Sequence, residues 1–140
     1  MNKKGFTLIE LLIVVAIIGL LSTLAVVALG SARVKARDSK RLADLKQLQT
    51  ALELYYTDNN AYPTVEGALG TGNFACLNSS GWQAAGCSSP YMGQVPTDPK
   101  TGSYTYTVSS SSYSVSASLE DDVGGLDSGA ITLTPAGIAN

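Results

Sequence analysis

The stretch FTLIELLIVVAIIGLLSTLAVVAL, residues 6–29, is predominantly apolar and carries a single charged residue, Glu10. A helix of these 24 residues extends over roughly 36 Å, and the hydrocarbon core of a bilayer is about 30 Å thick. A carboxylate inside such a span costs roughly 2.5–3.5 kcal/mol at mid-membrane and less near an end. We therefore predict a membrane-spanning helix in which Glu10 has a partner of opposite charge.

A second apolar pattern predicts that the helix continues past this span. Apolar side chains recur three or four positions apart, as on one face of an α-helix. They are Leu42, Leu45, Leu48, Leu52 and Tyr55. No proline occurs before Pro63, and the polar run at residues 58–60 is typical of a helix end. We predict one helix over about residues 6–58, apolar on all sides in its first half and amphipathic in its second.

The C-terminal part alternates between apolar and polar residues in the manner of β-strands. The apolar positions are Tyr104, Tyr106 and Val108, then Tyr113, Val115, Ala117 and Leu119. Their parity changes across residues 109–112, which predicts a tight hairpin turn there, and residues 130–134 are a plausible third strand. Residues 61–102 are predicted to be irregular. The expected fold class is α+β, a long N-terminal helix packed on a small antiparallel β-sheet head.

The two cysteines and the basic residues give opposite indications about membrane orientation. Cys76 and Cys87 lie in a loop rich in Gly and Ser. Outside the cytoplasm such a pair forms a disulfide, whereas two thiolates alone make a poor zinc site. Six Lys and Arg residues follow the apolar span and two precede it, and the more basic side normally stays in the cytoplasm. These residues alone leave the orientation open.

Charge is divided unevenly along the chain. Six of the nine basic residues lie in the second half of the predicted helix; they are Arg33, Lys35, Arg37, Lys40, Arg41 and Lys46. Over residues 47–140 a single Lys faces eight acidic residues, a net charge of −7. The pattern fits a solvated helix face beside an acidic surface. It also fits attraction between the basic helix and the acidic head of different copies, or contact with anionic lipid.

Gly5 followed by FTLIELLIVVAIIG, residues 6–19, resembles the N-terminus of type IV pilins and of the related pseudopilins of type II secretion. The shared features are a short basic leader, a Gly before the apolar span, a Phe that begins the span and a single Glu. The resemblance implies that a prepilin peptidase cuts between Gly5 and Phe6 and methylates Phe6. It also implies a cytoplasmic leader and an external head, in agreement with a disulfide between Cys76 and Cys87.

The resemblance further implies four segments. They are a cytoplasmic leader at residues 1–5, a transmembrane and filament-core helix at 6–30, the amphipathic half of the helix at 31–60 and a globular head at 61–140. The expected function is that of a structural pilin, held in the inner (cytoplasmic) membrane as a single-pass protein with a cytoplasmic N-terminus. Polymerisation would give an extracellular or periplasmic helical filament, a pilus or fimbrium at the cell surface. Expected partners are further copies, prepilin peptidase, inner-membrane assembly machinery and, before assembly, membrane lipid.

Two alternative functions share this architecture. One is the major pseudopilin of a type II secretion system, and the other is a minor pilin acting as an anchored DNA- or ligand-binding module. Nucleic acid is disfavoured as a partner because the expected head has a single basic residue, Lys100. An enzyme is not expected, because the chain has no histidine and no phosphate-binding or dinucleotide-binding Gly pattern.

Glu10 is the candidate assembly residue. It lies four residues after Phe6, about one helical turn, and cleavage leaves an α-ammonium on Phe6. A carboxylate and an ammonium at the same depth neutralise one another between neighbouring helices. We therefore expect Glu10 of one copy to pair with Phe6 of the next. In the alternative interpretation Glu10 lies at the interfacial edge of the span, solvated by headgroups.

Calcium is the one cofactor that the sequence suggests. Acidic residues separated by glycines follow the second predicted strand; they are Glu120, Asp121, Asp122 and Asp127. Carboxylate oxygens are ligands that Ca²⁺ prefers, and the resemblance to major pseudopilins implies a calcium site in a loop near this point of the fold. The spacing is not that of an EF-hand, and a solvated acidic turn is the alternative interpretation.

Overall fold

One long helix enters both of the compact units of the chain. The computed structural model describes residues 1 and 5–140, so residues 2–4 of the predicted leader lie outside the described residues. Helix α1 spans Leu8–Asn59, which confirms the predicted helix to within two residues at either end. The chain divides into one unit at Met1–Val34 and a second at Lys35–Asn140.

The C-terminal end of α1 is set by Asn60. This residue has a φ of 52°, and its N–H donates a hydrogen bond of 2.7 Å to the Tyr56 carbonyl. Asn adopts this left-handed conformation more readily than most residues, and one such residue commonly ends a helix. The polar run that predicted a helix end therefore does end it.

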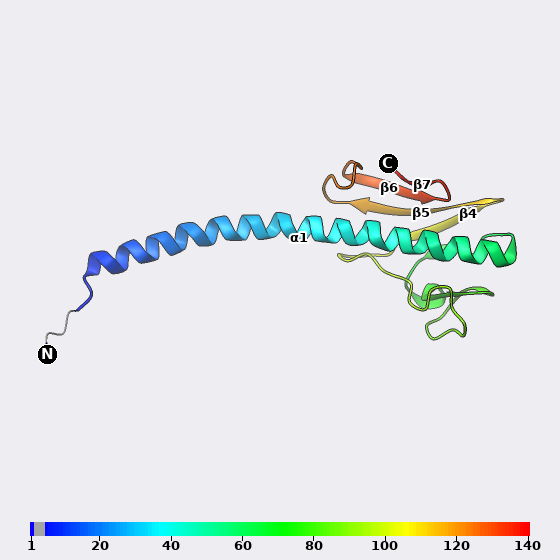
Figure 1. The fold of residues 1–140 in the computed structure, drawn as a ribbon, viewed down its shortest axis with the longest axis horizontal. Helices are drawn as coiled ribbons and strands as arrows, with labels where there is room; N and C mark the ends of the chain where they lie inside the picture. The colour runs from blue at the N-terminus through cyan, green and yellow to red at the C-terminus, as the bar shows by residue number, and fades with distance from the viewer. Residues whose placement is uncertain (2–4) are drawn as a thin grey trace. The chain divides into compact units, whose positions relative to one another are not determined.

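A five-stranded antiparallel sheet makes up the main part of the second unit (Figure 1). The strand order is β1-β4-β5-β6-β7. The strands are β1 (Gly67–Ala68), β4 (Thr105–Ser109), β5 (Ser112–Leu119), β6 (Gly129–Thr134) and β7 (Gly137–Ala139). Figure 1 shows the sheet running alongside the C-terminal half of α1. The α+β fold class, with a helix packed on a small antiparallel sheet, is confirmed.

Strands β4 and β5 form the hairpin that the alternation predicted. Ser109 faces Ser112 in the strand register, so Ser110 and Ser111 make a two-residue turn. Ser110 has a φ of 40°, and such tight turns need a left-handed residue at this position. Strand β6 pairs with β5 and confirms the third predicted strand.

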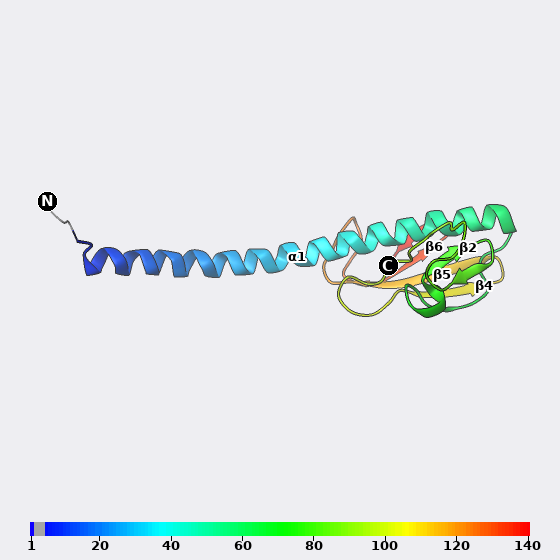
Figure 2. The ribbon, with the colours of Figure 1, turned by 90° about the horizontal axis from the view of Figure 1, so that it is seen from below.

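Residues 61–102 contain more regular structure than we predicted. Besides β1 they form the 3-10 helix η1 (Gly72–Phe74) and a hairpin of β2 (Cys76–Asn78) with β3 (Gly81–Gln83). In Figure 2 this hairpin overlaps β4 and β5. The ring of Trp82 in β3 packs against that of Tyr106 in β4, with centroids 5.2 Å apart. Elements of two or three residues are too short for an alternating pattern to reveal.

The core of the second unit lies between α1 and the sheet. Leu45, Leu48 and Leu52 of the predicted apolar face are completely buried, while Leu42 and Tyr55 at its ends are partly buried. Each buried Leu contributes about 1.5–3 kcal/mol relative to exposure. This packing fixes which residues of α1, from Lys35 onward, meet the loops of the head.

Candidate functional site

The predicted cleavage site lies in an exposed segment before helix α1. Gly5, Phe6 and Thr7 are not helical, and α1 begins at Leu8. The Phe6 side chain is 93% exposed, and a Cβ placed on Gly5 meets no atom within 4 Å. The peptide bond between Gly5 and Phe6 is therefore accessible to an enzyme. Its cleavage stays a prediction.

Glu10 forms a capping box with Thr7 at the start of α1. The Glu10 Oε2 accepts hydrogen bonds from the Thr7 backbone N–H and from the Thr7 Oγ1, both at 2.8 Å. The Thr7 Oγ1 in turn accepts a hydrogen bond of 3.3 Å from the Glu10 backbone N–H. Two N–H groups that would otherwise lack partners at the helix start are satisfied in this way.

Thr7 belongs to this site although we did not predict it. Thr-x-x-Glu directly before an apolar run is the sequence signature of a capping box, and TLIE at residues 7–10 matches it. Glu10 thus has a partner within its own chain. A single copy cannot contain the pairing of Glu10 with Phe6 of a neighbour, so that pairing stays a prediction.

The apolar half of α1 exposes its side chains on every face. Every Leu, Ile and Val from Leu8 to Leu29 is at least 50% exposed. Among the described residues, α1 is the one helix long and apolar enough to cross a membrane. Soluble proteins rarely expose apolar patches larger than a few hundred Å². This half of the helix therefore needs a cover of lipid or of other protein chains.

Arg41 is the centre of a buried ion network in the second unit. Its side chain is only 3% exposed. The Nε and Nη2 donate to the two oxygens of Asp98 at 2.6 and 2.9 Å, while Nη1 donates to Asp38 at 2.6 Å and to Glu120 at 2.9 Å. These contacts raise the pKa of Arg41 above its ordinary value, and the hydrogen bonds to Asp98 have the largest effect. A buried guanidinium is tolerated when it is paired in this way.

Glu120 joins the network from the residue after β5. Its carboxylate accepts two hydrogen bonds from Arg37, at 2.7 and 2.8 Å, and one from the Lys100 Nζ at 2.8 Å, in addition to that from Arg41. These donors hold the pKa of Glu120 well below its usual range, and Arg37 has the largest effect. Glu120 is therefore ionised at neutral pH and connects β5 to α1 and to the segment before β4.

Asp38 anchors the loop after β5 to α1. Its side chain is fully buried, and its oxygens accept hydrogen bonds from the backbone N–H of Glu120 at 3.1 Å and of Asp121 at 2.9 Å. Further along α1, Asp44 accepts a hydrogen bond of 2.9 Å from the Tyr104 hydroxyl. Burial, together with this carboxylate, raises the pKa of Tyr104 well above its ordinary value. Both contacts fix loops of the head to the helix.

Three of the six basic residues in the second half of the helix form ion pairs, Arg37 and Arg41 with carboxylates of the head and Lys40 with Asp44 one turn along α1. The interpretation of this segment as a solvated face is wrong for Arg41, which is 3% exposed, and for the partly buried Arg37, but it holds for Lys40, whose side chain is 52% exposed. The attraction between the basic helix and the acidic head, which we considered between copies, operates within one copy for Arg37 and Arg41. Their partners Asp98 and Glu120 lie 57 to 83 positions away, so local spacing could not reveal the pairs.

The four predicted calcium ligands are not brought together. The Glu120 carboxylate is occupied by cationic donors, Asp121 accepts from the Asp122 N–H at 2.9 Å, and Asp122 accepts from the Ser128 N–H at 2.8 Å. Asp127 is exposed. In the described part of the chain, no group of three or more His, Cys, Asp or Glu side chains is arranged to hold a metal ion. The residues of this loop therefore do not fit a calcium site.

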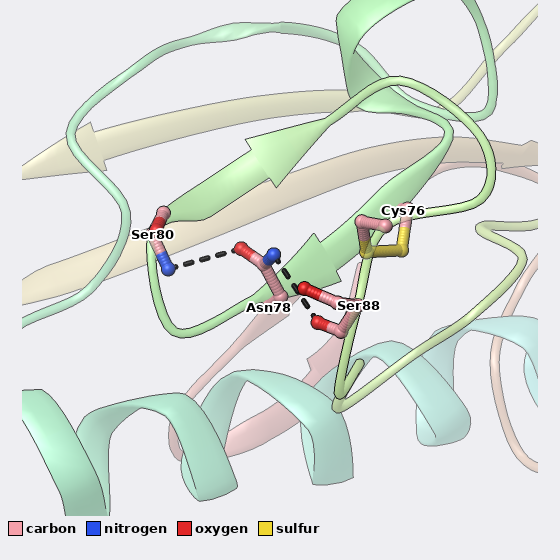
Figure 3. Close-up of a disulfide and its surroundings, with 5 residues drawn as sticks. Cys76, Asn78, Ser80 and Ser88 are labelled. Carbon is pink, nitrogen blue, oxygen red and sulfur yellow. Dashed lines mark hydrogen bonds between the residues drawn. A yellow bond between two sulfur atoms is a disulfide. The ribbon is translucent and has the colours of Figure 1, made fainter.

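Cys76 and Cys87 form a disulfide, as predicted (Figure 3). Their Cα atoms are 6.2 Å apart, and 11 positions separate them in the sequence. Figure 3 shows Asn78 beside the bridge, where its side-chain oxygen accepts from the Ser80 N–H at 3.0 Å and its amide donates to the Ser88 carbonyl at 3.4 Å. The bridge and these bonds hold a loop in place, which is a structural role.

Comparison with known proteins matches two family models to parts of this chain. A family model described as type II secretion system (T2SS), protein G, matches residues 28–131, and one described as the prokaryotic N-terminal methylation motif matches residues 1–30. The type II secretion system core protein G of Aeromonas hydrophila is 41% identical over 68 residues, 49% of this chain and 48% of that protein. The protein of the same name from Pseudomonas aeruginosa is 34% identical over 111 residues, 75% of this chain and 73% of that protein.

The Escherichia coli K12 protein of this name is 40% identical over 68 residues, 49% of this chain and 47% of that protein. The matched region spans about half the length of most of these curated relatives. No solved structure matches the chain. The protein G model nevertheless covers well over half of this chain and includes most of the head. The chain therefore belongs to the type II secretion system protein G family.

Proposed function

We propose that this chain is a structural, non-catalytic subunit that polymerises through the apolar half of α1 into a helical, pilin-like filament. Before assembly it is stored in the inner membrane as a single-pass protein. A prepilin peptidase removes residues 1–5 and methylates Phe6. Residues 6–30 then form the filament core, residues 31–60 carry the head along the helix, and residues 61–140 form the filament surface.

The observation that carries this proposal is the change of exposure along α1. Up to Leu29 the large apolar side chains are at least half exposed, whereas Leu45, Leu48 and Leu52 are buried against the sheet of the head. The second unit has a core of its own, formed by α1 from Leu45 onward and the sheet. Lipid covers the first part of the helix in the monomer, and helices of other copies cover it in the filament.

The relatives favour a pseudopilus over a surface pilus. The proteins matched in Aeromonas hydrophila and Pseudomonas aeruginosa are named type II secretion system core protein G. By this relationship the filament is a short periplasmic one that works with a secretion machine. A surface pilus is the second candidate, because the N-terminal motif of residues 1–30 is of a kind found in pilins as well.

The head is proposed to lie outside the cytoplasm. The disulfide between Cys76 and Cys87 supports this orientation, since such bonds persist in oxidising compartments. Arg33 and Lys35, just beyond the apolar span, are exposed and suit the headgroup region of anionic lipid. A DNA-binding head has little support, because Lys100 donates its hydrogen bond to Glu120.

Substitution Gly5→Val, made in the source bacterium, tests processing and assembly together. We expect the wild-type chain to begin at N-methylated Phe6 and to occur in filaments seen by electron microscopy, either in material sheared from the cell surface or in extracts of the periplasm. Gly5→Val should retain residues 1–5, measured by mass spectrometry, and remain in the membrane, because a branched side chain obstructs the peptidase. Gly30→Val is the matched control for cleavage, since it makes the same change far from the cut. Filaments built from uncut Gly5→Val chains would contradict the proposal.

Deletion of the gene separates the two kinds of filament. Loss of secreted proteins from the medium, with surface pili unchanged, identifies a pseudopilus. Loss of surface pili with normal secretion identifies a pilus subunit. If both secretion and surface pili are unchanged, the chain is not a required subunit of either filament and the proposal fails.

A further inference from the structure

Three carboxylates from separate parts of the second unit converge on one guanidinium. Asp38 belongs to α1, Asp98 precedes β4 and Glu120 follows β5. All three accept hydrogen bonds from Arg41 at 2.6–2.9 Å. Carboxylate oxygens gathered from distant segments around one positive centre are what a bound hard cation requires. In this head the positive centre is a side chain of the same protein.

This centre holds the same loop for which we predicted calcium. Asp38 accepts the backbone N–H groups of Glu120 and Asp121, the first two residues after β5. The Glu120 carboxylate then reaches back to Arg37 and Arg41 on α1. The loop is therefore fixed to the helix by both its backbone and its side chain. A cation in a loop achieves the same result by drawing oxygen ligands together.

The charges of the network cancel, which argues against a further cation. The three negative and three positive groups are Asp38, Asp98, Glu120, Arg37, Arg41 and Lys100. A divalent ion added to this set would leave an excess of two positive charges. Asp38 and Arg41 are shielded from water, and excess charge in such a place is costly. A metal ion could enter only if basic side chains left.

We propose that the Arg41 guanidinium is the built-in structural cation of this head, in place of the calcium ion that the family resemblance implies near the loop after β5. The head therefore folds, and keeps this loop in position, without a divalent metal. The inference concerns the head alone and does not depend on the kind of filament that the chain forms.

The full chain in detergent micelles allows a direct test of metal dependence. Trp82 and all seven tyrosines lie between residues 55 and 113, so the near-ultraviolet circular dichroism of these rings reports on the head. Thermal unfolding is measured after treatment with a chelator and again with millimolar Ca²⁺. A head that bound Ca²⁺ would gain stability by mass action. We expect the same unfolding temperature in both conditions, and a rise of several degrees with Ca²⁺ overturns the proposal.

A matched pair of variants tests the network itself. Glu120→Gln removes a charge that three cations contact, whereas Asp121→Asn makes the same change at a neighbour whose carboxylate accepts only the Asp122 N–H within the described residues. We expect Glu120→Gln to lower the unfolding temperature by several degrees and Asp121→Asn to change it little. Equal effects of the two, or no effect of Glu120→Gln, overturn the proposal. Should Glu120→Gln not fold, Arg37→Gln replaces it as the milder change. Arg37→Gln must then lower the unfolding temperature by more than Asp121→Asn does.

Discussion

The two units of the chain differ in the solvent exposure of their apolar side chains. In Met1–Val34 the Leu, Ile and Val side chains from Leu8 to Leu29 are exposed on every face of α1. In Lys35–Asn140 side chains of the same types form a closed core, reinforced by an ion network and a disulfide. The first unit thus depends on its surroundings for stability, and the second on its own contacts. Substitutions in the first should change assembly, and those in the second should change unfolding.

Glu10→Val should have the largest effect, and it should act on assembly and not on the stability of the head. It removes the charge that we expect to pair with Phe6 of a neighbouring copy, so filament yield should fall to background. Cleavage after Gly5 should continue, and the unfolding temperature of the head should be unchanged. The three properties are measured by electron microscopy of filaments from the cell surface or the periplasm, by mass spectrometry of the N-terminus and by near-ultraviolet circular dichroism.

Glu10→Gln is the control that separates two roles of this side chain. Gln can keep the capping box with Thr7 but carries no charge. If charge pairing drives assembly, the filament yield of Glu10→Gln falls to background as that of Glu10→Val does. If the carboxylate serves only to cap α1, Glu10→Gln forms filaments at normal yield and the pairing with Phe6 is excluded.

Arg41→Ala should have the largest effect on the stability of the head. It leaves the buried Asp38 and the carboxylates of Asp98 and Glu120 without their common partner. Removal of one member of a buried ion network costs about 3–5 kcal/mol. We expect this loss in the free energy of unfolding, measured by denaturant titration of the full chain in micelles.

Lys46→Ala is the control for Arg41→Ala. It removes the same charge from the same helix at an exposed position, so it should cost less than about 1 kcal/mol. Cleavage after Gly5 should be normal in both variants. An Arg41→Ala chain as stable as Lys46→Ala would show that the network contributes nothing to the head.

This network also marks where prediction from the sequence ended. The helix was predictable because its apolar face repeats over five positions and no proline interrupts it, and β4 and β5 were predictable from their alternation. The contacts of Arg41 with Asp98 and Glu120 join residues 57 and 79 positions apart. No local spacing encodes such pairs, and the acidic loop was therefore interpreted without its cations.

Local contacts at the candidate site were within reach of the sequence. The capping box of Thr7 and Glu10 follows a four-residue signature, and it was missed because Glu10 was considered as a charge to be paired with another copy or solvated by headgroups, and not as a residue that caps its own helix. Strands β1, β2, β3 and β7 were out of reach for a different reason. Each has two or three residues, and pairing with neighbouring strands, rather than composition, makes them strands.

Loss of the disulfide should weaken the head by somewhat less than loss of Arg41. The bond between Cys76 and Cys87 closes a short loop, and on the chain-entropy model such a closure contributes about 3 kcal/mol. Cys76→Ser with Cys87→Ser should lower the free energy of unfolding by about that amount, and a reductant should do the same to the wild-type chain. Ready alkylation of both thiols in the native, unreduced protein would contradict this prediction.

Acid should weaken the head through Asp98. Arg41 foremost, with the backbone N–H groups of Lys100 and Thr101, lowers the pKa of Asp98 below its ordinary value of 3.8. A carboxyl group with a lower pKa in the folded state stabilises the fold fully above its unfolded pKa, and this contribution is lost as the pH falls through the folded pKa. The unfolding temperature of the wild-type chain should therefore decrease when the pH is lowered below 3.8. Asp98→Asn should unfold at a lower temperature than the wild type at neutral pH, and its unfolding temperature should decrease less on acidification. If acid lowered the unfolding temperature equally in both chains, Asp98 would be excluded as the source of the acid effect.

Thr7→Ala should have the smallest effect, and it should appear at the start of α1 rather than in the head. The substitution removes the Oγ1 that accepts from the Glu10 N–H and donates to the Glu10 carboxylate. Loss of such a cap costs about 0.5–2 kcal/mol, so amide hydrogen exchange in the first helical turn should be several-fold faster in micelles. Thr7→Ser keeps the hydroxyl and should exchange as the wild type does. Exchange unaffected by Thr7→Ala would mean that the surrounding lipid or detergent, and not the capping box, holds the first turn of the helix.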